Sequence, residues 1–226
     1  QYRGYSAYRL AVLHGVVRGP SAGHLRSGLL LDSPPAVRDL KLRQATLARL
    51  PASVSRPSFE RSRLAPGIVH LGCGAFHRAH QAVFTQAALE AEGAAGKLNW
   101  GILGVSPRGQ AVRDRLRAQD WLYTVAERDA AGERLTVIGV LTQVLVVPED
   151  PGAVVTRIAE PTTKIVSTTV TEKGYCHDPA TGHLNDRHPY IIHDLEHPGA
   201  PLSALGLIVA GLERRRARGG RPLTVL

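Results

Sequence analysis

A short apolar run that ends in two closely spaced glycines and continues into a helix-forming segment constrains this fold more than any other feature. The run is Ile68-Val69-His70-Leu71, and Gly72 and Gly74 follow it directly. Residues from about 78 to 92 are rich in Ala, Gln and Leu, which favour helix. A strand, a glycine turn and a helix in this order open a βαβ unit, the building block of a parallel sheet.

The same alternation continues along the chain. We expect further strands over 100–105, 123–127, 135–140, 141–147 and 164–171 and one beginning at 222, with helices over 109–119, 151–159 and 203–218. The Asp129-Ala130-Ala131-Gly132 segment predicts a hairpin turn, Ser203 is a candidate helix cap, and residues 177–200 are loop-rich. The order predicts an α/β fold with a Rossmann-like, doubly wound parallel sheet in which 68–71 is a central strand.

Three segments differ in composition. Residues 1–35 show no sustained period, and we expect a poorly ordered extension. Residues 36–66 predict a helix over 36–50 followed by a Pro-, Ser- and Arg-rich connection. Residues 67–226 are expected to form a dinucleotide-binding domain. The chain contains no methionine, and residues 222–226 read as a strand that has barely begun, so we expect truncation at both ends.

The net charge of +9 suggests a nucleic-acid-binding protein as one alternative. Residues 1–65 hold 11 of the 28 basic residues and 3 of the 19 acidic ones, which leaves 17 against 16 for the rest of the chain. Tyr2, Tyr5 and Tyr8 lie among these arginines and could stack on bases. Because the excess is confined to the leading segment and no known module accompanies it, we expect no nucleic-acid partner.

Membrane insertion and secretion are not indicated. No apolar run reaches the roughly 18 residues that span a bilayer. Two cysteines, Cys73 and Cys176, do not suggest a disulfide framework. We therefore expect a cytoplasmic protein without a membrane partner.

Histidine is abundant and allows a zinc-binding alternative. His70, Cys73, His77 and His80 form one possible group. A second possible group is His177, His183, His188, His193 and His197. The glycine turn explains Cys73 as a small residue between two glycines, so we expect no metal.

The glycine turn carries the candidate chemistry. Gly72 permits a tight turn after the strand, and Gly74 allows the backbone to approach a pyrophosphate closely. The amides at the start of the following helix would then face this anion. The third glycine of the usual G-x-G-x-x-G pattern is replaced by His77, so the generic fingerprint is degenerate.

A more specific pattern is Gly72-Cys73-Gly74-Ala75-Phe76-His77-Arg78-Ala79-His80. This segment resembles the signature of the mannitol dehydrogenase family, long-chain polyol dehydrogenases that include fructuronate and tagaturonate reductases. The segments Trp100–Val105, Val170–Cys176, His193–Pro198 and Pro222–Leu226 are similar to further stretches of that family, in the same order. The resemblance covers about residues 40 to 226.

The resemblance implies an NAD- or NADP-dependent oxidoreductase that oxidises a secondary alcohol of a sugar alcohol or reduces the matching ketose. The mannitol-to-fructose reaction and the reduction of fructuronate or tagaturonate are both compatible with it. The implied cofactor-binding residues are Gly72, Cys73, Gly74, Ala75, Phe76, His77, Arg78, Ser106, Arg108 and Thr171. Thr171 is expected near the nicotinamide, where a central strand ends.

The choice between NAD and NADP depends on the loop after the second strand. An acid there would bind the adenosine ribose and favour NAD. This loop is Ser106-Pro107-Arg108-Gly109-Gln110-Ala111 and contains no acid. Arg108 could instead meet a 2′-phosphate, so both cofactors stay open.

No catalytic residue is assigned. In the family, the proton-transfer lysine and its asparagine and histidine partners belong to a mostly helical carboxyl-terminal domain, which we expect to be absent here. Lys173 is interpreted as a structural or loop-lining residue. We therefore expect the chain to bind cofactor without turning over a polyol.

Overall fold

A five-stranded parallel sheet forms the body of the molecule. The structure is a computed structural model that describes residues 9–13, 41–93, 96–130 and 132–226. The sheet order is β7-β4-β3-β8-β9, and every neighbouring pair is parallel. Its strands are β3 (Pro66–Leu71), β4 (Gly101–Ser106), β7 (Leu141–Val146), β8 (Ile165–Thr168) and β9 (Thr224–Val225). The predicted strand at 68–71 is therefore the central one.

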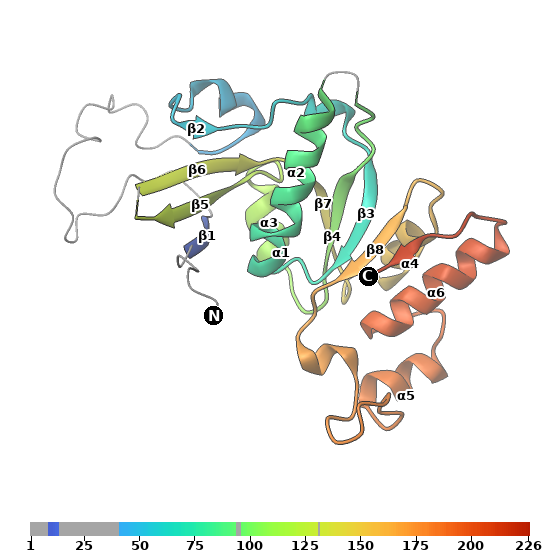
Figure 1. Cartoon of the computed structure of the whole chain (residues 1–226). Helices are drawn as coiled ribbons and strands as arrows, with labels where there is room; N and C mark the ends of the chain where they lie inside the picture. The colour runs from blue at the N-terminus through green and yellow to red at the C-terminus, as the bar shows by residue number, and fades with distance from the viewer. Residues whose placement is uncertain (1–8, 14–40, 94–95, 131) are drawn as a thin grey trace, which may run out of the picture.

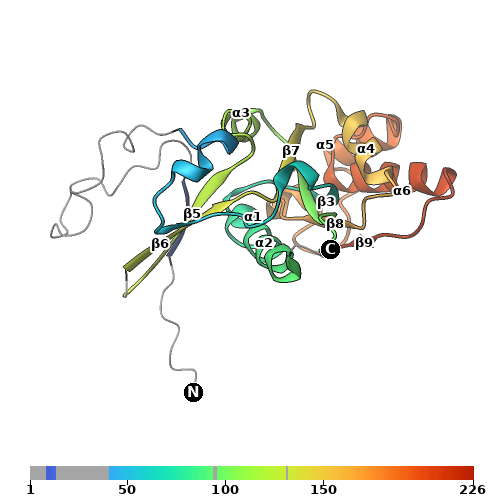
Figure 2. The ribbon, with the colours of Figure 1, turned by 90° about the horizontal axis from the view of Figure 1, so that it is seen from above.

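Helices cover both faces of this sheet. They are α1 (Ala75–Ala79), α2 (Gln81–Glu92), α3 (Ala111–Arg117), α4 (Pro151–Ala159) and α6 (Ala204–Ala217), whereas a further helix, α5 (Pro189–Glu196), lies away from the sheet near α6 (Figure 1). Leu89 of α2 and Leu116 of α3 are buried in one core cluster with Ile102 of β4. Ile158 of α4 and Leu207 of α6 are buried in a second cluster with other strand residues. Figures 1 and 2 show these helix pairs on opposite sides of the sheet, which confirms the doubly wound fold.

A second sheet stands beside the first. It contains β1 (Arg9–Leu13), β5 (Tyr123–Asp129), β6 (Gly132–Ile138) and β2 (Val54–Ser55), in the order β1-β5-β6-β2. The β5–β6 pair is the predicted hairpin, and it projects away from the side that carries α4 and α6 (Figures 1 and 2). The strand predicted over 141–147 does not extend this hairpin; it is β7 of the main sheet.

The leading segment departs from the sequence-based expectation. Arg9–Leu13 pairs antiparallel with Thr124–Arg128, so the prediction of a poorly ordered extension is wrong for these five residues. The outer edge of β5 offers unpaired backbone groups, and composition alone does not show that a distant segment will bond to them. The remainder of 1–35, and residues 36–40 of the predicted helix, lie outside the described residues.

The segment from residue 41 to 66 also differs from the expected helix and connection. Within the predicted helix over 36–50, the described part contains a 3-10 helix, Gln44–Arg49. The connection after it contains a second 3-10 helix, Arg61–Arg63. Leu42, Leu50 and Val54 pack with the base of the hairpin in a third core cluster, so tertiary burial organises this segment.

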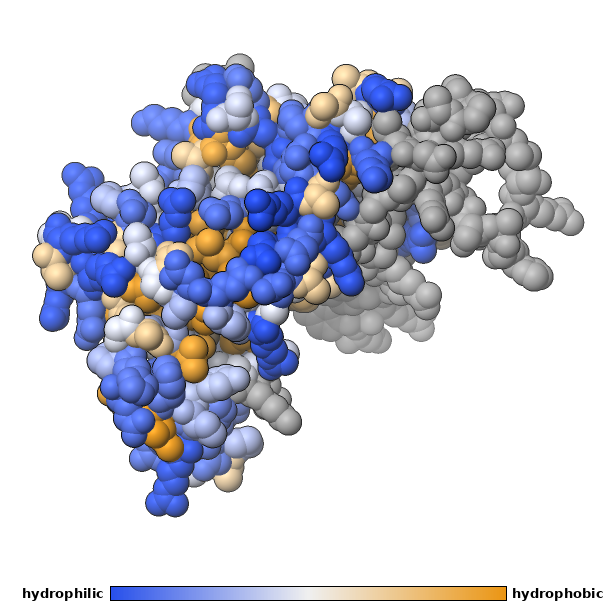
Figure 3. Space-filling view, turned by 180° about the vertical axis from the view of Figure 1, so that it is seen from behind, coloured by the Kyte–Doolittle hydropathy of each residue, from blue (hydrophilic) through white to orange (hydrophobic). Residues whose placement is uncertain are grey.

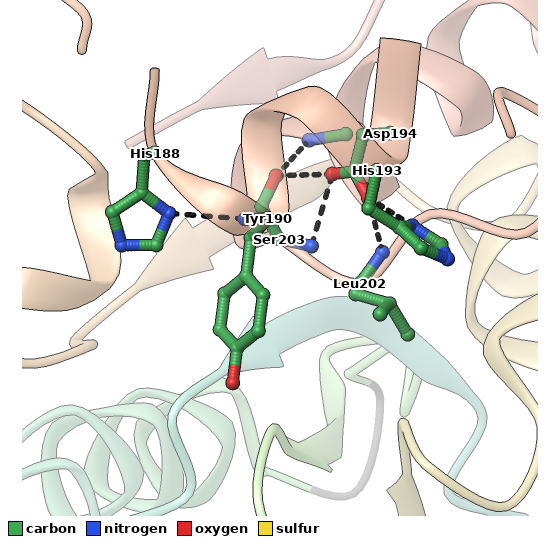
Figure 4. Close-up of polar contacts among 7 residues, drawn as sticks. His188, Tyr190, His193, Asp194, Leu202 and Ser203 are labelled. Carbon is green, nitrogen blue, oxygen red and sulfur yellow. Dashed lines mark hydrogen bonds and ion pairs between the residues drawn. The ribbon is translucent and has the colours of Figure 1, made fainter. Parts of the chain in front are cut away.

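The loop-rich segment 177–200 contains α5, which the sequence analysis did not predict. Proline at the first position suits a helix start. The Asp194 carboxylate of α5 accepts the amides of Leu202 (2.6 Å) and Ser203 (3.0 Å), as Figure 4 shows. The Ser203 hydroxyl oxygen accepts the Gly206 amide at 2.9 Å, so the predicted cap of α6 is confirmed. Asp194 thereby joins α5 to the start of α6.

The surface seen from behind is mostly hydrophilic, with apolar residues in small patches (Figure 3). None of the helices in the described part of the chain is both long and apolar enough to cross a membrane.

Candidate functional site

The glycine turn follows the central strand, and its backbone is fixed by the neighbouring strand. The amides of Gly72 and Cys73 both donate to the Val105 carbonyl, at 2.9 and 3.2 Å. Gly72 has φ of +100°, a left-handed conformation that favours glycine. A Cβ at this position would lie 2.6 Å from the Thr169 carbonyl oxygen. Gly72 is therefore required by the fold itself.

Gly74 is required by nothing within the described fold. Its φ is −79°, and a Cβ added there would meet only the Gly72 oxygen, at 3.7 Å. The residue is exposed and forms the N-cap of α1, where the first bonded helical amide is that of Arg78, to Gly74, at 3.2 Å. The first amides of a helix have no partner within it and can face an anion. The open space at Gly74 suits the close approach of a ligand.

The other side chains of the motif divide into two groups. Ala75 and Phe76 are exposed, and the Phe76 ring stacks on His80 with centroids 4.3 Å apart. Cys73, His77 and Arg78 are buried. These three side chains therefore point into the protein rather than toward a ligand at the turn.

The buried Arg78 side chain stabilises the glycine turn through a hydrogen bond. Its guanidinium donates to the Cys73 carbonyl at 2.6 Å, and the Tyr123 hydroxyl donates to the Arg78 carbonyl at 2.8 Å. Tyr123 belongs to β5, so this contact ties the second sheet to the glycine motif. Sequence reasoning did not identify Tyr123, because nothing local to β5 indicates which carbonyl its hydroxyl will meet.

A buried polar cluster lies beneath the turn. The rings of His70 and His77 stack with centroids 3.6 Å apart. Burial lowers the pKa of His70 to about 4, while a backbone hydrogen bond to Gly72 opposes this shift. Burial, and next the neighbouring His70, lower the pKa of His77 to about 3. Both imidazoles are therefore neutral at pH 7.

Two predicted residues from distant segments meet at the carboxyl edge of the sheet. Arg108, after β4, donates to the Thr171 hydroxyl, after β8, at 3.2 Å. The strands β4 and β8 flank β3, so this exposed pair lies on either side of the glycine turn. Ser106 is engaged within its own loop, where its hydroxyl donates to the Gly109 carbonyl at 2.6 Å.

The proposed zinc groups do not assemble in the part of the chain that the structure describes. No three His, Cys, Asp or Glu side chains gather there closely enough to hold a metal ion. His70 and His77 are engaged in the polar cluster, and His80 contacts the Phe76 carbonyl at 2.8 Å. Burial raises the pKa of the Cys73 thiol to about 11, which disfavours the thiolate that binds metals.

A glycine turn at the end of a central parallel strand, with polar loops on both sides, defines a Rossmann-type dinucleotide-binding domain. The sequence model of the mannitol dehydrogenase Rossmann domain matches residues 66–226. The chain belongs to the mannitol dehydrogenase family, as the glycine motif predicted.

Individual relatives agree with this assignment. The chain is 47% identical over 178 residues to D-mannonate oxidoreductase of Escherichia coli, covering 76% of this chain and 36% of that protein. It is 45% identical over 177 residues to mannitol 2-dehydrogenase of Cereibacter sphaeroides, covering 77% and 36%. It thus spans about 36% of the length of these relatives.

Solved structures show the same fold. Mannitol 2-dehydrogenase of Pseudomonas fluorescens, in a ternary complex with NAD and D-mannitol, superposes with a TM-score of 0.76 at 38% identity. The match covers 81% of this chain and 37% of that one. A substrate-free D-sorbitol dehydrogenase gives a TM-score of 0.75 at 35% identity, covering 81% and 38%.

Proposed function

We propose that this chain is the dinucleotide-binding part of an NAD(P)-dependent oxidoreductase that acts on the CH–OH group of a sugar alcohol or on the matching ketose. The observation that carries the proposal is the open approach at Gly74, where this chain has a glycine although the fold leaves room for a side chain. The similarity to an enzyme solved with NAD and D-mannitol supports the choice of ligand.

The cofactor pyrophosphate would lie over the segment from Gly72 to Arg78. The exposed backbone at Gly74 and Ala75 would approach the phosphates, with Phe76 beside them. The buried side chains Cys73, His77 and Arg78 would act from inside, because they hold the turn and do not reach its outer surface. The direct contacts therefore come from the main chain.

The loops on either side would hold the two ends of the dinucleotide. Ser106 and Arg108 follow the second strand of the βαβ unit, where the adenosine ribose binds in this type of fold. Thr171 would lie toward the nicotinamide. Because Arg108 is exposed and no acid accompanies it, a 2′-phosphate could be accommodated, and Arg108→Ala should weaken NADP(H) more than NAD(H). Equal losses would assign Arg108 no role in this choice.

The bound cofactor would accept or deliver a hydride at the carbinol carbon of the polyol. That reaction also needs a group that takes or returns the alcohol proton. We assign this role to none of the described residues, so we expect the 226-residue chain to bind cofactor without oxidising mannitol. Cofactor-dependent turnover by this chain would overturn that part of the proposal.

Gly74→Val tests the site directly. A valine side chain would fill the space proposed for the pyrophosphate, yet its Cβ disturbs nothing in the described fold. We expect NADH binding, followed by nicotinamide fluorescence, to be lost while the thermal unfolding midpoint changes little. Gly199→Val is the matched control, because Gly199 also has open space around its Cβ and lies in the loop between α5 and α6. Unaltered NADH affinity in Gly74→Val would refute the site.

A further inference from the structure

Five side chains beneath the glycine turn join into one continuous hydrogen-bonded series. They are His77 and Gln81 from the α1–α2 segment, His70 from β3, and Ser167 and Thr169 from β8 and the residue following its end. The last member, Thr169, reaches the Gly72 carbonyl at 3.0 Å. The series thus connects the start of the first helical segment to the first glycine of the turn.

The direction of each hydrogen bond follows from the carbonyl at the end of the series. A carbonyl only accepts, so the Thr169 hydroxyl donates its proton to Gly72. Its oxygen then accepts from His70 Nε2, 2.8 Å away, which places the imidazole hydrogen on Nε2. A neutral imidazole has one such hydrogen, so His70 Nδ1 accepts from the Ser167 hydroxyl at 2.8 Å.

The same reasoning fixes the remaining members. Ser167 Oγ lies 3.1 Å from Gln81 Nε2 and 3.2 Å from Gln81 Oε1, to which it could donate only if its proton were not given to His70. Because the Ser167 hydroxyl proton is used for His70, the Ser167 oxygen accepts from Gln81 Nε2. Gln81 Oε1 is then an acceptor, and His77 Nδ1 donates to it at 3.1 Å. His77 therefore carries its hydrogen on Nδ1. Its buried Nε2 is a lone pair that has no hydrogen-bond partner among the described residues.

Burial favours this single arrangement. His70 and His77 are both fully buried, and the low pKa values of about 4 and about 3 keep one hydrogen on each ring at neutral pH. With one hydrogen per ring and a carbonyl at the end, each hydrogen bond of the series has one donor and one acceptor. A second proton on His70 would remove the Nδ1 acceptor and break the series, whereas a second proton on His77 would place an N–H without a partner at its buried Nε2.

We propose that His77, Gln81, Ser167, His70 and Thr169 act as positioning residues that hold the Gly72 carbonyl inward and so set the glycine turn for dinucleotide binding. This role rests on the proposed function of the turn. The Gly72 oxygen also accepts the Gly74 amide at 2.5 Å, so its orientation fixes both glycines at once. Gly74 is also the N-cap of α1, and His77 in the first turn of that helix is the other end of the hydrogen-bonded series.

The first test is spectroscopic and needs no variant. Nitrogen-15 NMR of labelled imidazoles distinguishes the two neutral tautomers in the unliganded 226-residue chain. We expect the hydrogen on Nε2 for His70 and on Nδ1 for His77 at pH 7. A charged ring, or the opposite tautomer at either histidine, would overturn the series. This measurement does not depend on cofactor binding.

The second test separates positioning from simple stability. Ser167→Ala removes a member that does not touch Gly72, and we expect NADH affinity to fall about fivefold, the effect of losing one ordinary hydrogen bond. Thr169→Val should lower the affinity at least as much, and Thr169→Ser should restore it. If both deletions bind NADH like the parent, the positioning role is wrong.

Thr163→Val is the matched control. Thr163 is also buried and donates to a backbone carbonyl, that of Arg157 at 2.6 Å, beyond the opposite end of β8 from the turn. It should lower the unfolding midpoint as Thr169→Val does and leave NADH affinity unchanged. An equal loss of affinity in Thr163→Val would show that reduced stability alone explains the effect. If the parent binds no dinucleotide, the proposed function and the positioning role both fail. The NMR measurement of the two histidine tautomers still tests whether the hydrogen-bonded series exists.

Discussion

The parallel sheet and the β5–β6 hairpin use their residues in opposite ways. Five of the six residues of β4 are buried, and polar groups of the sheet collect where its strands end. The hairpin is buried at its base and exposed toward its tip, where Arg128 and Glu133 form a cross-strand ion pair. Strands covered on both faces support a precisely placed turn, whereas a half-covered hairpin tolerates exposed charges at its end.

The glycine turn is held more rigidly than the tip of the hairpin. In the main sheet, polar groups at the turn are buried and bonded to one another, so moving one displaces its partners. In the hairpin, the Tyr123 hydroxyl at the base links the two regions through the Arg78 carbonyl. The base of the hairpin also packs against the glycine motif, because Tyr123, Val125 and Ile138 are buried in one core cluster with Cys73. The tip of the hairpin is expected to be independent of cofactor binding.

Acid should produce the largest difference between the two sheets. The unfolded chain protonates each histidine near pH 6.5, but folded His70 and His77 do so only near pH 4 and pH 3. Acid therefore favours unfolding, and stability present above about pH 6.5 is lost as the pH falls toward these values. Each pKa unit corresponds to about 1.4 kcal/mol, so the loss should reach several kcal/mol.

Hydrogen exchange as a function of pH checks this prediction, because β5 and β6 contain no histidine. Amides of β3 and β8 should lose protection between pH 6.5 and pH 4, and His77→Gln should reduce the steepness of the change. Identical pH profiles for the parent and the variant would contradict the prediction.

A matched pair of core truncations should give the next largest contrast. Leu103 in β4 is 1% exposed, whereas Leu135 in β6 is only partly buried. Leu103→Ala should lower the free energy of unfolding by about 2–5 kcal/mol and Leu135→Ala by about 1 kcal/mol, because a cavity costs most where it cannot collapse. Urea unfolding measures both. Equal losses would mean that the hairpin base is packed as tightly as the sheet.

Two glycines with positive φ sharpen the comparison further. Gly72 (φ +100°) lies against the Thr169 backbone, whereas Gly132 (φ +135°) at the hairpin tip has nothing within 4 Å of an added Cβ. Gly132→Ala should cost about 1 kcal/mol from backbone strain alone. Gly72→Ala should cost about 2–3 kcal/mol and should also abolish NADH binding. Thermal unfolding measures the two stability losses, and NADH titration measures binding. Retained NADH binding in Gly72→Ala would contradict the assignment of the turn as the dinucleotide site.

The smallest effect is expected at the hairpin tip. Glu133→Gln removes the cross-strand ion pair with the half-exposed Arg128. Solvent screens such a pair, so the free energy of unfolding should fall by less than about 0.5 kcal/mol. NADH affinity should be unchanged. A change in affinity would show that the tip communicates with the turn, contrary to the comparison.

The sequence by itself determined the features whose signals are local. The glycine turn after 68–71, the helix Pro151–Ala159 and the Ser203 cap of α6 all follow from residues a few positions apart, and the structure has them there. The family was likewise indicated by a contiguous motif around Gly72 and Gly74 and by other short contiguous segments, and the match over residues 66–226 confirms it.

Only the tertiary structure decided which distant groups meet. It paired Arg9–Leu13 with β5 and brought Arg108 to Thr171. It also turned His77 and Arg78 inward and joined His70 to Ser167 and Thr169 across nearly a hundred residues of chain. Spacing along the chain indicates which residues share a face of one element, but a buried hydrogen bond depends on how separate elements pack. The conformation of the turn is therefore determined by residues adjacent in the sequence, whereas the groups that hold it come from strands that only folding brings together.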